Sequence, residues 1–155
     1  FSRVEDNGSG VAAPQHRAVV YYGYERRVYQ RNLSQPQDFS NVSDVIASLL
    51  LPLEDGVDAD DTEVGDMAIS PLGKRLFISM QAGHPHPSRG LIYEYQLPTA
   101  FQLNNAILFD SISYPLTANH SGYMRISPDG QFLFINQSTS SSSNATRIDR
   151  YLLRQ

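Results

Sequence analysis

The asparagines are the residues whose type and spacing most clearly indicate chemistry, namely the attachment of N-linked glycan. The 155-residue chain contains eight asparagines, and six of them begin an Asn-x-Ser/Thr triplet with no proline in the middle. These six are Asn7, Asn32, Asn41, Asn119, Asn136 and Asn144. Chance alone gives on the order of one such triplet in a chain of this composition. The excess favours a glycoprotein.

The six triplets differ in how well they would accept a glycan. Four fall in predicted loops, where a bulky group can project into water, and Asn41, Asn119 and Asn144 are the strongest candidates among them. Asn32 and Asn136 lie near the ends of predicted strands. The alternative explanation is that Asn and Ser are both turn residues and therefore co-occur in loops. Glycan attachment implies a secretory route, so we expect an extracellular protein, either secreted or at a cell surface.

Two segments contain side chains that could hold a metal ion. His84 and His86 are separated by one proline, but a closed site needs further ligands that the sequence does not nominate. The acidic segment 54–63 could hold calcium through carboxylate oxygens, although it lacks the glycine and glutamate positions of an EF-hand loop. We expect a proline-stiffened surface loop and a solvated acidic loop, and we leave calcium in the 54–66 loop open. We predict no metal site and no cofactor.

Catalytic signatures are absent from the sequence. There is no Gly-x-Ser-x-Gly nucleophile context and no glycine-rich phosphate loop. Cysteine is also absent, which excludes disulfides, thiolate metal sites and a cysteine nucleophile. Several tyrosines could stack on sugars, but strand packing accounts for most of them. We therefore predict a protein that is not an enzyme, with no catalytic or cofactor-binding residues.

Composition restricts the class of protein and its partners. Apolar residues make up 41% of the chain and charged residues 18%, which is typical of a soluble globular protein. The net charge of −4 and the pI near 5.4 argue against a nucleic-acid partner, which favours a basic face. No apolar run approaches the roughly 18 residues of a membrane span. The chain begins at Phe1 without a signal-peptide pattern, so we expect a mature or trimmed chain, or a fragment.

An internal repeat organises the chain. Residues 67–78, MAISPLGKRLFI, recur as residues 124–135, MRISPDGQFLFI, and residues 11–21 form a fainter copy. The prolines of the three copies, Pro14, Pro71 and Pro128, are spaced 57 residues apart both times. Matched apolar flanks accompany this spacing, which indicates a true repeat.

Each repeat reads as four short strands joined by turns. The strand that follows the Ser-Pro-x-Gly turn is apolar on both faces, which is typical of a strand covered on both sides by neighbouring sheets. We therefore predict an all-β fold of β-propeller blades, in about three tandem four-stranded antiparallel units that do not close a ring alone. The expected units are 7–64, 65–121 and 122–155, the last incomplete, with 1–6 a possible edge strand of another blade. Another all-β arrangement, such as a sandwich, is the alternative.

The repeat resembles known propeller sequences. Ile-Ser-Pro-Asp-Gly followed by an apolar strand looks like the blade signature of many propellers, including lactonase-like and surface-layer families. Residues 92–103, IYEYQLPTAFQL, are closer to the Tyr-x-Tyr-x-Leu repeats of phage-tail and bacterial-surface propellers. Those relatives are chiefly structural or adhesive, and the resemblance is specific to fold rather than to activity.

Because three units do not complete a propeller ring, we expect them to assemble with further units. Three units leave a blade face open at each end, and burial of such faces stabilises contact with other propeller units, either of the same chain type or of a longer chain. Together with the glycosylation triplets, this predicts a non-enzymatic extracellular glycoprotein with a structural or adhesive role. A carbohydrate- or protein-binding surface module is one alternative, and a fragment of a lactonase-like propeller enzyme is another.

Overall fold

The computed structural model describes residues 11–12, 18–36, 38–53, 62–82, 89–115, 123–138 and 146–153. Every helix or strand assigned in these ranges is a β-strand, so none of them is a helix that could cross a membrane. The strands are β1 (Val11–Ala12), β2 (Val19–Tyr24), β3 (Arg27–Leu33), β4 (Val42–Leu50), β5 (Thr62–Ile69), β6 (Arg75–Ala82), β7 (Arg89–Gln96), β8 (Ile107–Pro115), β9 (Tyr123–Ile126), β10 (Phe132–Ser138) and β11 (Thr146–Leu152).

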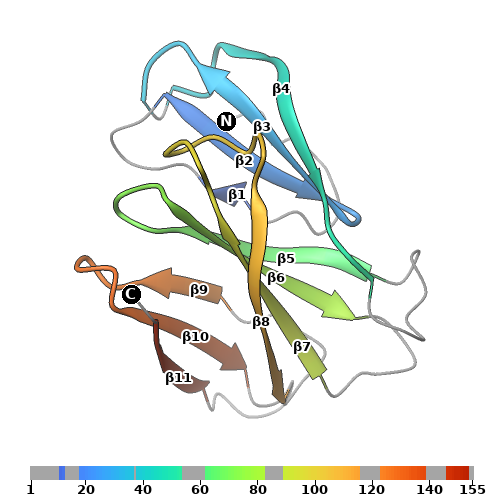
Figure 1. The fold of residues 1–155 in the computed structure, drawn as a ribbon, viewed down its shortest axis with the longest axis vertical. Coiled ribbons are helices and arrows are strands. Elements are labelled where there is room, and N and C mark those ends of the chain that lie inside the picture. Colours follow the sequence, from blue (N-terminus) through green and yellow to red (C-terminus); the bar gives the residue numbers. More distant parts are fainter. Residues whose placement is uncertain are drawn as a thin grey trace.

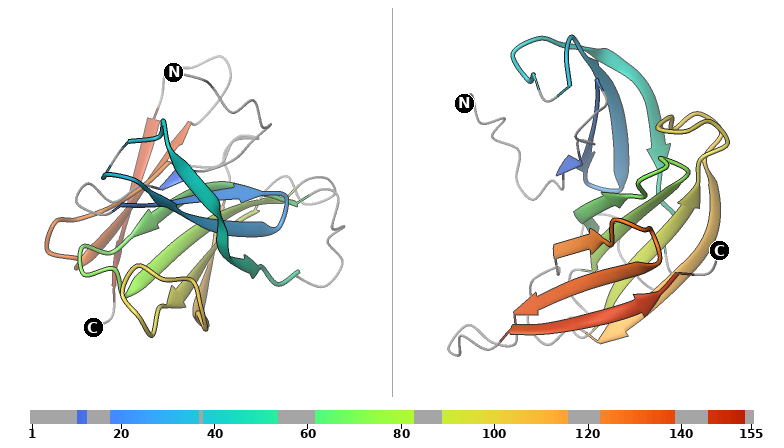
Figure 2. Two further views of the ribbon diagram at one scale, coloured as in Figure 1. Left: turned by 90° about the horizontal axis from the view of Figure 1, so that it is seen from above. Right: turned by 90° about the vertical axis from the view of Figure 1, so that its left-hand side faces the viewer.

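The strands form three antiparallel sheets, each built from consecutive strands (Figure 1). The first sheet has the order β1-β2-β3-β4, the second β5-β6-β7-β8, and the third β9-β10-β11. The sheets are stacked in chain order, and their first strands β1, β5 and β9 lie next to one another (Figure 2). This confirms the predicted all-β fold of about three tandem units, arranged as partial propeller blades that do not close a ring.

The Ser-Pro-x-Gly turns of the second and third sheets share one geometry. In the second sheet the N–H of Ser70 donates to the carbonyl of Arg75 at 2.9 Å, and the N–H of Gly73 donates back to Ser70 at 2.8 Å. The corresponding bonds in the third sheet measure 2.9 and 2.8 Å. Gly73 and Gly130 have φ values of 69° and 72°, which glycine adopts without strain. The two turn prolines therefore occupy equivalent positions, as their spacing predicts.

The first sheet follows the same pattern with a spacing of 56 residues instead of 57. A leucine at the end of the third strand of each sheet, or directly after it, donates its N–H to the carbonyl just before the second strand, at 2.8–2.9 Å: Leu33 to Ala18, Leu97 to Lys74, and Leu153 to Gln131. Ala18 and Lys74 are 56 positions apart. The outer strand pairs of the first two sheets also share an irregularity at the same place, after Gln30 and after Glu94.

Some sequence predictions fall on parts of the chain that the structure does not describe. Pro14 and the segment 1–6 lie outside the described residues. The strands β1 and β2 flank Pro14, and their residues lie 56 positions before the equivalent residues of β5 and β6. The 57-residue spacing of Pro14 therefore does not extend to these strands. The second sheet begins at Thr62, ahead of the expected unit boundary at 65.

Two hydrophobic clusters fill the spaces between the three sheets. One lies between the first and second sheets, and the other between the second and third. Strand β6 contributes to both, since Leu76 and Ile78 pack into the first cluster and Phe77 into the second. This strand is apolar on both faces because both faces are covered, which confirms the sequence-based interpretation.

Candidate functional site

The surfaces through which the sheets stack are the best-defined candidate site. We call the face of each sheet that points toward the next sheet in chain order its forward face, and the opposite one its rear face. The repeat places residues at equivalent forward-facing positions of the three sheets. These are Tyr21, Phe77 and Phe134 on the second strand, and Val28, Ile92 and Ile148 on the third strand.

The forward face of the first sheet binds a loop of the second sheet. The Tyr21 hydroxyl donates to the carbonyl of Phe101 at 2.7 Å, and burial raises the pKa of that phenol. The Gln30 amide donates to the same carbonyl at 3.0 Å and accepts the N–H of Leu103 at 2.7 Å. A backbone bond from Val64 N–H to the carbonyl of Glu25, at 3.0 Å, joins the inner parts of the two sheets. The buried polar groups are thus paired across the junction.

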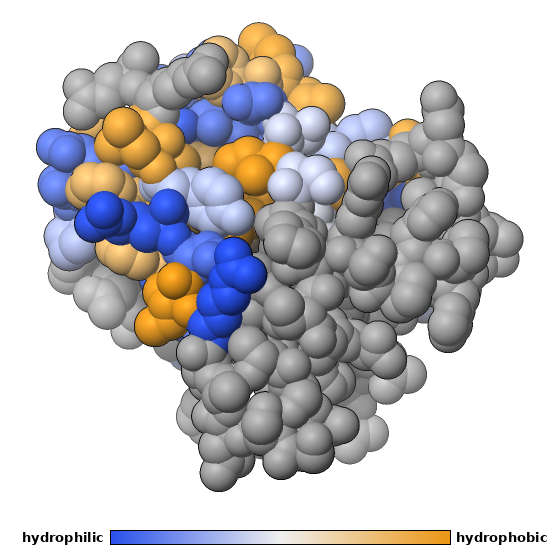
Figure 3. Space-filling model, turned by 90° about the horizontal axis from the view of Figure 1, so that it is seen from below, coloured by the Kyte–Doolittle hydropathy of each residue, from blue (hydrophilic) through white to orange (hydrophobic). Residues whose placement is uncertain are grey.

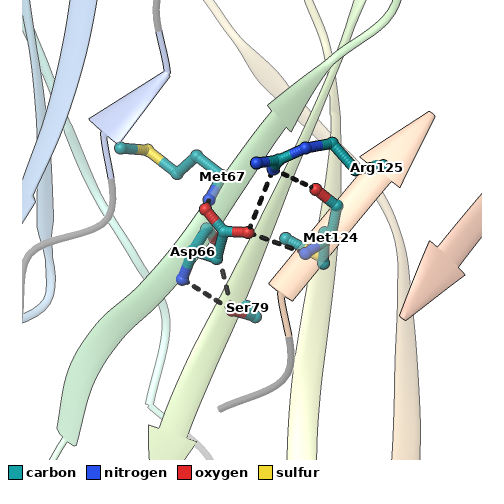
Figure 4. Close-up of polar contacts among 5 residues, drawn as sticks. All are labelled: Asp66, Met67, Ser79, Met124 and Arg125. Atoms are coloured by element: carbon teal, nitrogen blue, oxygen red, sulfur yellow. Dashed lines mark hydrogen bonds and ion pairs between the residues drawn. The ribbon is translucent and has the colours of Figure 1, made fainter. Parts of the chain in front are cut away.

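The second junction is joined by a buried carboxylate (Figure 4). The Asp66 carboxylate on β5 accepts a hydrogen bond from the N–H of Met124 on β9, at 2.7 Å. It also accepts one from the N–H of Met67, the next residue in the chain, at 2.8 Å. The Asp66 N–H donates to the hydroxyl of Ser79 on β6 at 2.7 Å. Asp66 therefore links the second sheet directly to the first strand of the third.

Opposing effects act on the acidity of Asp66. Burial raises the pKa of this carboxyl, while the N–H bonds from Met124 and Met67 lower it. The guanidinium of Arg125 also lowers the pKa, from 3.7 Å away, but this side chain is largely exposed and its contribution is small. Burial is the larger effect, so the pKa of Asp66 lies above its ordinary value.

A second charged pair lies on the forward face of the second sheet. Arg75 donates to Glu94 at 2.6 Å, and its guanidinium carbon lies 5.2 Å from the ring centroid of Phe77. Glu94 is buried and occupies the position that Gln30 has in the first sheet. Pairing with Arg75 lets this carboxylate stay in a buried place.

The forward face of the third sheet is open to solvent. Ile148 is 66% exposed, whereas its equivalents Val28 and Ile92 are both 0% exposed. Phe134 is half-buried and Arg150 lies over the ring of Phe132, 5.1 Å from the centroid. Seen from below, the coloured part of the surface shows apolar and strongly hydrophilic residues side by side (Figure 3).

The rear face of the first sheet is the other terminal blade surface, and it is exposed only in part, because Val20, which pairs with Arg31 on this face, is 6% exposed. Tyr24 is 45% exposed, whereas Met80, at the equivalent position of the second sheet, is 1% exposed. The rings of Tyr22 and Tyr29 stack at 5.1 Å, and Arg31 donates to the Tyr22 hydroxyl at 3.2 Å. This face presents aromatic rings and a cation where the rear face of the second sheet presents a packed core.

The predicted sites fall partly within the described residues. Asn32, Asn41 and Asn136 are exposed, while the asparagines of the other three triplets lie outside the described ranges. His84, His86 and residues 54–61 of the acidic segment also lie outside them, whereas residues 62–66, predicted as part of a loop, belong to β5. In the part of the chain that the structure describes, no three potential metal-ligating side chains gather.

The sequence did not reveal the polar residues of the junctions. Gln30 contacts Phe101 from 71 positions away, and Asp66 contacts Met124 from 58 positions away, so neither pair forms a local motif. A usable signal is the repeat itself, because it aligns Gln30 with Glu94 and Arg150 and so marks one polar position in each unit.

Comparisons with known proteins do not assign the chain to a family. A scan against protein-family models gave no match, and neither did a search of curated proteins.

Proposed function

We propose that this protein is a non-enzymatic extracellular glycoprotein with a structural or adhesive role, and that its copies assemble head to tail through blade faces. The forward face of the third sheet of one copy packs on the rear face of the first sheet of the next. The observation that supports this best is the contrast between Ile148 and its buried equivalents Val28 and Ile92.

A second copy of this chain is the occupant that best suits both open faces. Both junctions within the chain join a forward face to a rear face, and the forward face of the third sheet and part of the rear face of the first remain exposed. Two unlike surfaces on one molecule give heterologous contacts, which produce a ring or a filament according to the rotation between copies. Burial of apolar side chains such as Ile148 and Tyr24 supplies the driving force, at about 25 cal/mol per Å2.

The repeat type supports a structural role. The strand phrase that ends in Leu97, with Tyr93 and Tyr95 alternating before it, resembles that of phage-tail and bacterial-surface propellers. Both tyrosines are buried against the first sheet, so in this protein they act in blade packing.

Light scattering on the unglycosylated 155-residue chain tests the assembly. We expect a mass above that of one chain, rising with concentration. Ile148→Asp should reduce it to a single chain, because it places a charge in the contact. Leu72→Asp is the matched control, because Leu72 is an exposed apolar residue in a turn away from both faces. A monomer at every concentration, or equal effects of the two variants, contradicts the proposal.

The glycoprotein assignment has its own test. Intact mass before and after glycosidase treatment of protein from the native source should show glycan on several of the six triplets. A mass equal to that of the bare polypeptide removes the argument for an extracellular location.

A further inference from the structure

One glycosylation triplet lies on a surface that the assembly needs. Asn136 belongs to β10, and the pairing of Ile135 with Met124 matches that of Ile78 with Met67. Asn136 is therefore the equivalent of Ser79, on the forward face of its sheet. Asn136 is exposed, whereas Ser79 is 0% exposed.

The equivalent position is filled by a small residue at both packed junctions. In the second sheet it is Ser79, whose hydroxyl bonds to the backbone of Asp66. In the first sheet it is Gly23, where an added Cβ would lie 2.4 Å from side-chain atoms of Val64. Both junctions are closely packed at this point, so a sugar chain would have no space there.

A glycan cannot fit between two stacked blades. Packed sheets lie about 10 Å apart, and the side chains of the two faces fill that space. An N-linked glycan at this position would be bulky and hydrated, and burying its hydroxyls without partners is unfavourable.

We propose that N-glycosylation of Asn136 blocks the forward face of the third sheet and so stops head-to-tail assembly at that copy. This inference rests on the proposed function, and it concerns the triplet on the forward face that the next copy would cover. Asn41, in the loop before β4, is a control site because it lies outside the strand faces.

The test compares assembly with and without this glycan. Wild type, Ser138→Ala, Asn136→Ser and Asn41→Gln are produced in a glycosylating eukaryotic host, and wild type also in bacteria. Ser138→Ala removes the triplet but keeps Asn136, and Asn136→Ser reproduces the residue of the second sheet. Site occupancy is measured by peptide mass mapping, and molar mass by light scattering.

We expect chains with glycan at Asn136 to stay at the mass of one copy, as should Asn41→Gln. The two variants without the triplet and the bacterial protein should reach at least about twofold that mass. An unmodified Asn136, or glycosylated chains that assemble as well as Ser138→Ala, overturns the inference. If bacterial wild type remains a single copy, the proposed assembly itself is wrong.

Discussion

The second and third sheets show what a neighbouring blade does to the same sequence position. Phe77 and Ile92 are fully buried because the third sheet covers them, while Phe134 and Ile148 occupy the same positions with solvent in front of them. The residue two positions after the third-strand isoleucine changes too, from a buried Glu94 to an exposed Arg150. The repeat thus encodes a forward face in every unit, and the difference between the units lies in what covers it.

The largest expected difference in stability between the two sheets is at the phenylalanine of the second strand. In an Ile148→Asp background, which we expect to be monomeric, Phe77→Ala should lower the free energy of unfolding by about 3–5 kcal/mol, because it empties a packed junction. Phe134→Ala should cost about 1 kcal/mol, because its ring already contacts solvent. Urea unfolding measures both. Equal costs would show that the two forward faces are not in different environments.

Asp66 gives the next largest effect. Asp66→Asn replaces one accepting oxygen by an amide donor, so the N–H of Met67 or of Met124 loses its partner, at a cost of about 1–3 kcal/mol. Tyr123 occupies the equivalent position in the third sheet and is exposed, so Tyr123→Asn should change stability by less than about 0.5 kcal/mol.

The same carboxylate gives a pH dependence of known sign. Because burial raises the pKa of Asp66, the folded chain binds more protons than the unfolded chain between the ordinary and the raised value. Its contribution to the free energy of unfolding therefore falls as pH rises through that window. Unfolding curves across the acidic range should show this slope in wild type and less of it in Asp66→Asn. An unchanged slope contradicts the assignment.

The two turn glycines sharpen the comparison on a smaller scale. Both have positive φ, so alanine costs about 1 kcal/mol at either. At Gly73 an added Cβ would also meet ring atoms of Phe101 at 2.4 Å, while at Gly130 the nearest atom, on Pro71, is 3.6 Å away. Gly73→Ala should therefore be the more destabilising by about 1–2 kcal/mol in thermal or urea unfolding.

Ionic strength should have the smallest effect. We expect it to change the association constant between copies and not the stability of the fold. The forward face of the third sheet carries Arg150 and the rear face of the first carries Arg31, so the proposed head-to-tail contact would bring like charges together. Screening by salt weakens that repulsion, and the association constant should rise a few-fold between low and high ionic strength. Weaker association at high salt would mean that attraction between opposite charges dominates the contact.

Local patterns in the sequence predicted the fold more completely than they predicted the junctions. The apolar strand 132–135 and the Ser-Pro-x-Gly turns gave the sheets and their stacking, because both depend on residues close together in the chain. The sequence does not indicate the 56-residue offset of the first unit, because Pro14, Pro71 and Pro128 are equally spaced by 57 residues while the strands β1 and β2 are offset by 56.

The junction chemistry depends on contacts between units and could not be read locally. Gln30 meets its partners only after the first sheet has packed on the second. The sequence predicts a glycosylation triplet at Asn136, but its place on a forward face depends on strand register, which aligns it with Ser79.

Disulfide cross-linking between copies tests the central claim most directly, because the chain has no cysteine of its own. Ile148→Cys marks the forward face, and Tyr22→Cys marks the rear face at the position equivalent to Ile135, which packs in the same cluster as Ile92. Head-to-tail packing predicts covalent dimers when unglycosylated forms of the two variants are mixed and oxidised, and few when either is oxidised alone. Dimers formed equally by Ile148→Cys alone, or no dimers in the mixture, would contradict the account.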